Sequence, residues 1–133
     1  MSTASRELLA PRADVWGFLA EPYHLPDWWP GIVGVEPDLR GFAPGARWQV
    51  RILKHNIFTG RIPRESTLLI RDVEPYERWS WHLLAGEVDV EVRLRALEPE
   101  RTLVTCTTSG GRRRLPETAL KRLYDLVQTA ATW

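Results

Sequence analysis

The chain has few of the residues on which redox, metal and covalent chemistry depend. Cys106 is the single cysteine among 133 residues, so an internal disulfide is excluded. This cysteine usage is typical of a reducing, cytoplasmic compartment. The three histidines, His24, His55 and His82, are far apart and have no cysteine nearby in the sequence. The sequence therefore predicts no metal site and no bound cofactor.

An excess of charge and a long apolar run are also missing. Lys and Arg number 18 and Asp and Glu number 17, which gives a formal net charge of +1. Bulk charge therefore gives no indication of a nucleic-acid partner. No apolar segment approaches the roughly 20 residues of a membrane-spanning helix, and the first residues lack the basic-then-apolar order of a secretion signal. We expect no nucleic-acid partner, no stable membrane insertion and a cytoplasmic location.

Tryptophan is the residue that the chain has in excess, with seven copies. Its large, rigid side chain suits a packed core, the lining of a cavity or an adhesive surface. The length predicts one domain over residues 1–133, large enough to bury roughly two-thirds of the surface of the unfolded chain.

The first third of the chain predicts a strand followed by two short helices. A strand over residues 4–10 meets Pro11, which suits the start of a helix. Apolar residues at helical spacing follow, and Pro22 ends that helix. A second helical piece over Tyr23–Trp29 is cut off by a Pro-Gly pair. Both helices are too short to be stable alone, so they must pack on an apolar surface.

Alternating apolar and polar residues predict the strands that follow, at 32–39, 47–52, 66–73, 78–84, 88–97 and 102–108. The polar stretch 54–63 is interpreted as a loop or a distorted hairpin. Within 66–73 the inward face stays unassigned, because Thr67 and Leu69 compete with Leu68 and Ile70. A final helix over 116–130 has an apolar face that includes Leu120 and Leu123.

This order predicts an α+β fold, in which the final helix covers one buried face of an antiparallel sheet. Such a long sheet curls as it twists. Curling around one helix leaves a gap that Ala and Leu side chains cannot fill, and this gap would form a ligand cavity.

The opening run A-P-x-x-x-V-W-x-x-L followed by W-x-P-G-I resembles the START-like (SRPBCC) superfamily, the helix-grip fold shared with birch-pollen-type allergens. Within it, the polyketide cyclase/dehydrase family is the most similar. The matching positions are Ala10, Pro11, Val15, Trp16, Leu19, Trp28, Pro30, Gly31 and Ile32. The resemblance covers nearly the whole chain and implies about six to seven strands wrapped on a long C-terminal helix.

The side chains predicted to line the cavity are Trp48, Val50, Trp79, Trp81, Leu83, Val90, Val92, Leu120 and Tyr124. The alternative is that the same residues fill a solid core. Arg64, Glu65, Thr105 and Thr107 are further polar groups within reach, but no spacing marks a catalytic set, so the catalytic residues stay unknown. Arg112–Arg114 either hold an anionic group at the cavity mouth or form a solvated basic turn.

Three functions follow as hypotheses. The first is binding of a hydrophobic or aromatic small molecule, lipid-like or polyketide-like, between sheet and helix. The second, implied by the family resemblance alone, is a cyclase, aromatase or dehydratase acting in the same cavity. The third is a protein-interaction module that uses exposed tryptophans such as Trp29 and Trp133. We expect a monomer or a homodimer.

Overall fold

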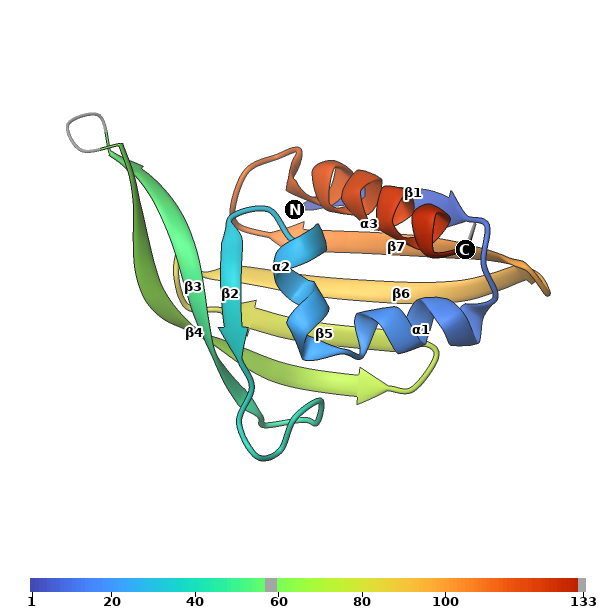
Figure 1. The fold of residues 1–133 in the computed structure, drawn as a ribbon, viewed down its shortest axis with the longest axis horizontal. Coiled ribbons are helices and arrows are strands. Elements are labelled where there is room, and N and C mark those ends of the chain that lie inside the picture. The colour runs from blue at the N-terminus through green and yellow to red at the C-terminus, as the bar shows by residue number, and fades with distance from the viewer. Residues whose placement is uncertain (57–59, 132–133) are drawn as a thin grey trace.

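The computed structural model describes residues 1–56 and 60–131. Its strands form one antiparallel sheet in the order β1-β7-β6-β5-β4-β3-β2 (Figure 1). Among the described residues, no helix has the length and hydropathy needed to cross a membrane. The strands are β1 (Ser2–Leu8), β2 (Ile32–Glu36), β3 (Arg47–Asn56), β4 (Gly60–Glu74), β5 (Arg78–Leu83), β6 (Val88–Glu98) and β7 (Arg101–Ser109), and the helices are α1 (Arg12–Leu19), η1 (Pro22–His24), α2 (Leu25–Trp28) and α3 (Leu115–Ala131).

The sheet is a series of consecutive antiparallel strands, to which the first strand is added beside the last. From β2 to β7 each strand pairs with the next one along the chain. β1 instead pairs with β7, from Ser2 opposite Thr108 to Leu8 opposite Thr102. The open edges are therefore β1 on one side and β2 on the other.

Several element boundaries differ from the sequence predictions. β1 covers 2–8 rather than 4–10, and β2 ends at Glu36, before the proline that cannot donate to a sheet. Of the two interpretations of 54–63, the hairpin is supported by the described residues, because β3 continues to Asn56 and pairs with β4 from Gly60 onward. Polar composition did not prevent strand pairing there, since neighbouring strands satisfy the backbone groups.

β4 contains a bulge, at which the inward face passes to the other set of alternating residues. Leu68 and Ile70 are buried and lie opposite Leu83 and Trp81. The register shifts between Ile70 and Asp72, after which Val73 faces Trp79. An extra residue in one strand moves the following side chains to the other face. The shift accounts for the inward side chain of Val73, whereas Leu69, before the bulge, is an apolar residue on the outer face opposite His82.

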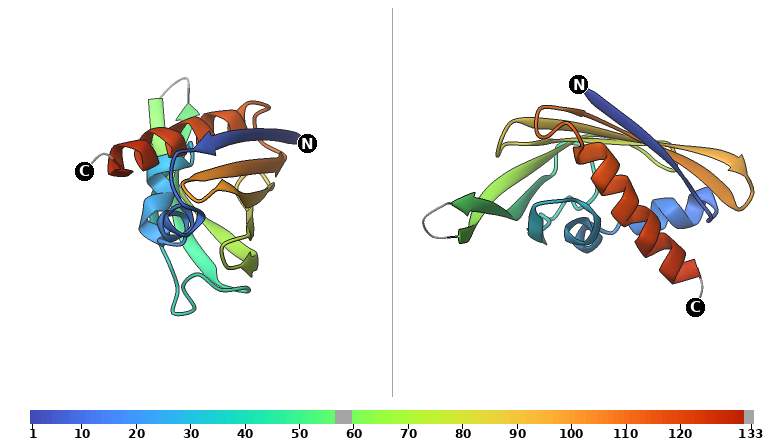
Figure 2. Two further views of the ribbon diagram at one scale, coloured as in Figure 1. Left: turned by 90° about the vertical axis from the view of Figure 1, so that its right-hand side faces the viewer. Right: turned by 90° about the horizontal axis from the view of Figure 1, so that it is seen from above.

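The helices all lie on the concave face of the sheet (Figure 2), which confirms the predicted α+β helix-grip architecture. α3 packs on β1, β7 and α2, α1 packs on β6 and β7, and α2 packs on β2. The predicted packing of α3 on the sheet is therefore confirmed, and the two short helices cover further strands beside it. A helix is about 10 Å wide and strands lie about 4.8 Å apart, so one helix covers only two or three strands.

Candidate functional site

A connected group of aromatic rings occupies the middle of the concave face, and we call it the aromatic cluster. Trp79 lies at its centre, with ring centroids 4.4 Å from Trp81 and 4.6 Å from Phe42. Rings from α1, α2, the loop before β3, and strands β3 and β5 all contribute. Its members are Trp16, Trp28, Trp29, Phe42, Trp48, Trp79 and Trp81.

The predicted facing of the aromatic strands is confirmed. Trp48, Trp79 and Trp81 each have no exposed surface, whereas Arg47 and Arg95 are exposed. Regular alternation in β3 and β5 places these rings together on the inner face.

The prediction that Trp29 is exposed is wrong, because this side chain is 1% exposed. Its ring lies edge-on to Trp28 at 5.5 Å and to Trp81 at 5.1 Å. Trp29 directly follows α2, whose four residues are too few to show a helical period. Trp133, the second tryptophan of that hypothesis, lies outside the described residues.

Three indole N–H groups in the cluster are buried without a hydrogen-bond partner in the described part of the chain. They belong to Trp28, Trp79 and Trp81. The indole of Trp48, by contrast, donates to the backbone carbonyl of Gly41 at 2.7 Å. An unsatisfied buried donor costs about 1–3 kcal/mol, which edge-on contact with a neighbouring ring offsets only in part. The cluster is thus a buried, largely apolar group of rings in which three indole donors are unpaired.

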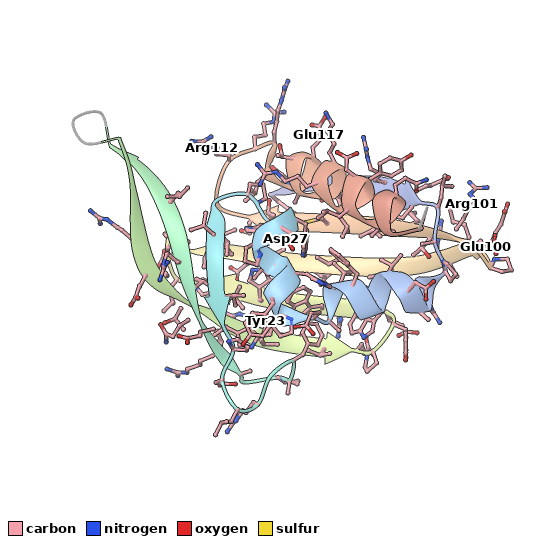
Figure 3. The ribbon with its side chains drawn as sticks, viewed as in Figure 1. Tyr23, Asp27, Glu100, Arg101, Arg112 and Glu117 are labelled. Carbon is pink, nitrogen blue, oxygen red and sulfur yellow. The ribbon has the colours of Figure 1, made fainter. Side chains whose placement is uncertain are left out.

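Beside the cluster lies a pocket of about 580 Å³, which we call the α2–α3 pocket. It lies between α2, the sheet and the first two turns of α3, and Trp29 separates it from Trp81. The lining is mainly apolar, with Arg112 on the loop before α3 (Figure 3). The lining residues are Pro26, Trp29, Pro30, Gly31, Ile32, Val33, Ile52, Leu53, Leu83, Val88, Gly111, Arg112, Leu115 and Arg122.

The residues predicted to line a cavity are divided between two pockets and the buried inner face of the sheet. Leu83 lines the α2–α3 pocket, and Leu120 lines a separate pocket beside β1. Tyr124 is half-buried on the β1 side of α3, with the Arg6 guanidinium 5.1 Å from its ring centroid. The others are buried on the inner face of the sheet: Trp48, Val50, Trp79, Trp81, Val90 and Val92. Contact of these residues with a ligand stays a prediction.

The polar residues predicted to lie within reach of the cavity are found on different faces of the sheet. Thr105 and Thr107 bond the hydroxyls of Ser5 and Thr3 on the outer face, and Glu65 is exposed there opposite Arg51. These three residues therefore do not reach the concave side. Arg64, which is also exposed, shares the inner face with buried Ile52, its partner across the strands.

Two inner threonines of β7 were missed as polar groups on the concave side. Thr102 donates to the carbonyl of Ala10 at 2.8 Å, and the buried hydroxyl of Thr108 has no partner among the described residues. Their positions follow the same alternation as the buried residues Val104 and Cys106 of this strand. The sequence therefore contained the signal that places them inside.

The cysteine is buried, and two of the histidines are held by hydrogen bonds to neighbouring residues. Burial raises the pKa of the Cys106 thiol to about 12. His24 stacks on Phe18 and bonds its carbonyl at 2.8 Å, and His82 bonds the Asp89 carboxylate at 2.8 Å. The side chain of His55 lies outside the described part. Among the described residues, no three His, Cys, Asp or Glu side chains gather as a possible metal site.

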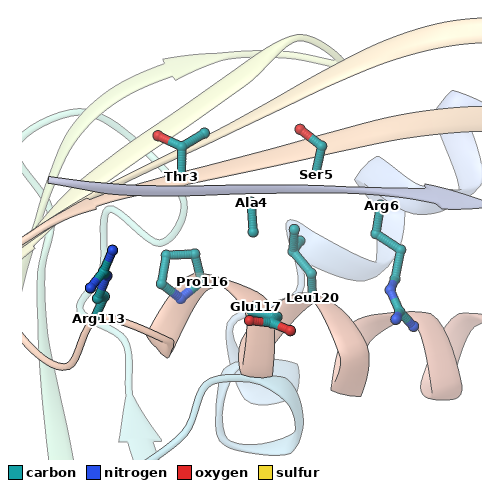
Figure 4. A pocket seen from close by; sticks show the side chains of 8 residues that line it. All are labelled: Thr3, Ala4, Ser5, Arg6, Arg113, Pro116, Glu117 and Leu120. Atoms are coloured by element: carbon teal, nitrogen blue, oxygen red, sulfur yellow. The ribbon is translucent and has the colours of Figure 1, made fainter.

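Two further pockets contain charges of both signs. One lies between β1 and α3, where Arg6 and Arg113 share the lining with Glu117 (Figure 4). In that view Ala4 and Arg6 point toward α3, whereas Thr3 and Ser5 point away from it. The other pocket lies near the β4–β5 turn and combines four arginines with Glu74 and Glu77. In both, acidic groups of the lining offset part of the positive charge.

Comparison with solved structures shows the same fold in several proteins. The di-domain ARO/CYC StfQ from the steffimycin biosynthetic pathway is 21% identical with a TM-score of 0.70, over 98% of this chain and 45% of that chain. An AHSA1-like protein from Aeromonas hydrophila is 19% identical with a TM-score of 0.69, over 98% and 95%. A protein from Nitrosomonas europaea is also 19% identical, with a TM-score of 0.66 over 98% and 96%.

All three identities lie below 25%, so these similarities establish the helix-grip architecture and nothing beyond the fold. No protein-family model matches the chain. No curated protein matches it either. The chain is thus similar in structure to AHSA1-like proteins and to one half of a cyclase di-domain.

Proposed function

We propose that the protein binds a hydrophobic or aromatic small molecule between the sheet and α3, in the α2–α3 pocket. The observation that carries this proposal is the pocket itself, which has a volume of about 580 Å³ and is lined mostly by apolar residues, Trp29 among them. Ligand sites of this kind are concave, apolar and equipped with few polar groups. The helix-grip fold, which encloses a space between sheet and helices, supports the same interpretation.

Binding is favoured over catalysis by the chemistry of the lining. Its described residues include no Asp, Glu, His, Cys or Tyr, the side chains that most often transfer protons or attack a substrate. Arg112 and Arg122 are its charged groups, and an arginine side chain stays protonated near neutral pH. Cyclase activity, the function in the name of StfQ, stays an alternative that rests on the fold.

The aromatic cluster extends this site inward. Trp29 lines the pocket and its ring centroid lies 5.1 Å from that of Trp81, so a displacement of this side chain would bring a ligand in the pocket next to Trp81. A ligand oxygen in that position would accept from the unpaired indole N–H groups. Contact with Trp79 and Trp81, as the sequence predicts, would therefore add both area and hydrogen bonds.

The test is intrinsic tryptophan fluorescence titrated with 2-naphthol, a flavonoid and a fatty acid. We expect quenching with micromolar dissociation constants, roughly −8 kcal/mol, because the polar contacts are few. Val33→Asn, at a half-exposed lining position, should weaken binding several-fold because it adds an amide to an apolar wall.

Leu9→Asn is the matched control, since Leu9 is equally exposed and does not line the pocket. It should leave each dissociation constant unchanged. If no probe binds below about millimolar, near −4 kcal/mol, the binding proposal is wrong. Turnover of a poly-β-ketone analogue, measured on the same protein, would instead support the cyclase alternative.

A further inference from the structure

The α2–α3 pocket carries positive charge that its own lining does not neutralise. Arg112 and Arg122 border it, and the remaining lining residues are apolar, glycine or proline. In the other two pockets, glutamates accompany the arginines. Neither Arg112 nor Arg122 forms an ion pair with another residue that the structure describes.

Helix geometry directs both arginines to the same pocket. Leu115 and Arg122 are seven residues apart, which places them on one face of α3 about two turns from each other. Arg112 lies just before the helix, where its carbonyl accepts from the Leu115 N–H at 3.1 Å. The two guanidinium groups therefore approach the apolar pocket from separate points along one side of α3.

The loop that carries Arg112 is held tightly against β6. Gly110 and Gly111 have φ angles of +88° and +74°, which side-chain-bearing residues rarely adopt. A Cβ atom on Gly110 would lie 2.6 Å from the Glu87 carbonyl oxygen, and one on Gly111 would lie 3.1 Å from Leu115. This close packing fixes the backbone next to Arg112, which reduces the entropy lost when its side chain binds a ligand.

We infer that the ligand of this pocket is an amphipathic anion, with an apolar body and a terminal carboxylate or phosphate group. The inference rests on the proposed function, because the apolar body would occupy the α2–α3 pocket. Arg112 and Arg122 would bind the anionic group at the rim, where each guanidinium presents donors in the fork that matches these groups. Both arginines are exposed at this rim, so salt should weaken their attraction for the anionic group.

The experiment compares three ligands with one apolar body: 2-naphthamide, 2-naphthoate and 2-naphthyl phosphate. Dissociation constants are measured by tryptophan fluorescence at low salt and again at high salt. At low salt, at least one anion should bind about tenfold tighter than the amide, as expected for charge-assisted hydrogen bonds. That advantage should shrink at high salt. The ranking of the two anions distinguishes a carboxylate ligand from a phosphate ligand.

The Arg112→Gln/Arg122→Gln double variant should bind all three ligands with the affinity that the parent has for the amide. Arg113→Gln is the matched control, because this neighbouring arginine lines the pocket beside β1 (Figure 4). It should retain the preference for the anion.

Each remaining outcome overturns a defined claim. Equal affinity for the amide and both anions, or loss of the preference in Arg113→Gln alone, would refute the anionic ligand and leave the apolar pocket standing. If neither the amide nor the anions bind, the proposed function is itself wrong, and this inference is wrong with it.

Discussion

Cys106 shows how position on a strand determines the chemistry of a side chain. It faces the interior from β7, between Val104 and Thr108 on the same face, and has no exposed surface. Burial disfavours the thiolate and raises the pKa of the thiol to about 12. The nucleophilic form is therefore almost absent near neutral pH.

We predict that Cys106 is unreactive in the folded protein and that it weakens the fold at alkaline pH. The unfolded thiol ionises near pH 9, whereas the folded thiol stays protonated up to about pH 12. Stability should therefore fall as the pH rises through this window, by up to about 1.4 kcal/mol per pH unit.

The measurement is denaturant unfolding of the parent and of Cys106→Ala at pH 8 and pH 11, together with labelling by a thiol reagent at pH 7.5. The parent should lose more stability than the variant between the two pH values. It should also label fully only after unfolding. Rapid labelling of the native protein would contradict the assigned position of Cys106.

For single residues, the sequence could predict the inward or outward facing of a side chain only where apolar and polar residues alternate regularly. Trp48, Trp79 and Trp81 lie in strands with a clear period, and their inward facing is confirmed. Trp29 and Phe42 lie next to a four-residue helix and in a loop, where no period exists. Their contacts with Trp81 and Trp79 are visible only in the structure. The sequence could therefore predict the strand residues of the aromatic cluster but not these two.

Among the elements, α3 combines a packing role with a role in the candidate site. Its buried face, which includes Ala119, Leu120, Leu123 and Val127, lies on β1, β7 and α2. Arg122 and Leu115 extend from the same helix to the α2–α3 pocket. A change in how α3 is seated would therefore alter both stability and the pocket.

We predict that Leu123→Ala destabilises the protein by about 2–5 kcal/mol, because this fully buried side chain would leave a cavity between α3 and the sheet. Lys121→Ala, on the exposed face of the same helix, should change stability by less than about 0.5 kcal/mol. Both values come from urea unfolding at pH 7. Equal effects would mean that α3 does not pack as described.

The elements themselves were largely predictable, and their cover of the sheet was not. Alternation located β3, β5, β6 and β7, and a helical period located α3. The facing of β4 was not predictable, because Leu69 on the outer face is as apolar as Leu68 on the inner face, and the register then shifts between Ile70 and Asp72. The two short helices have too few residues to show which strands they contact, so their place on the sheet could not be predicted.

The whole molecule has one sheet and one continuous core. The aromatic cluster joins α1 and α2 to β3 and β5, and the pairing of β1 with β7 joins the first strand to the last. No part of the described core is separate from the rest. Such a structure has no natural subunit that could unfold by itself.

We therefore predict a single cooperative unfolding transition. Tryptophan fluorescence reports the aromatic cluster, and far-UV circular dichroism reports the sheet and α3. Their urea midpoints should coincide within error, as for other single domains of this size. Distinct midpoints would show that α3 or the β3–β4 hairpin unfolds independently of the cluster.

The pairing of β1 with β7 also has a consequence for the order of events during synthesis. β1 leaves the ribosome before the other strands of this sheet, yet the strand that it pairs with, Arg101–Ser109, is the last of them. Until those residues emerge, β1 has no neighbour in the sheet, and α3, which covers it, has not yet been made. The nascent chain must therefore carry β1 as an unpaired strand until β7 has emerged, and β1 joins the sheet only after the other strands have been made.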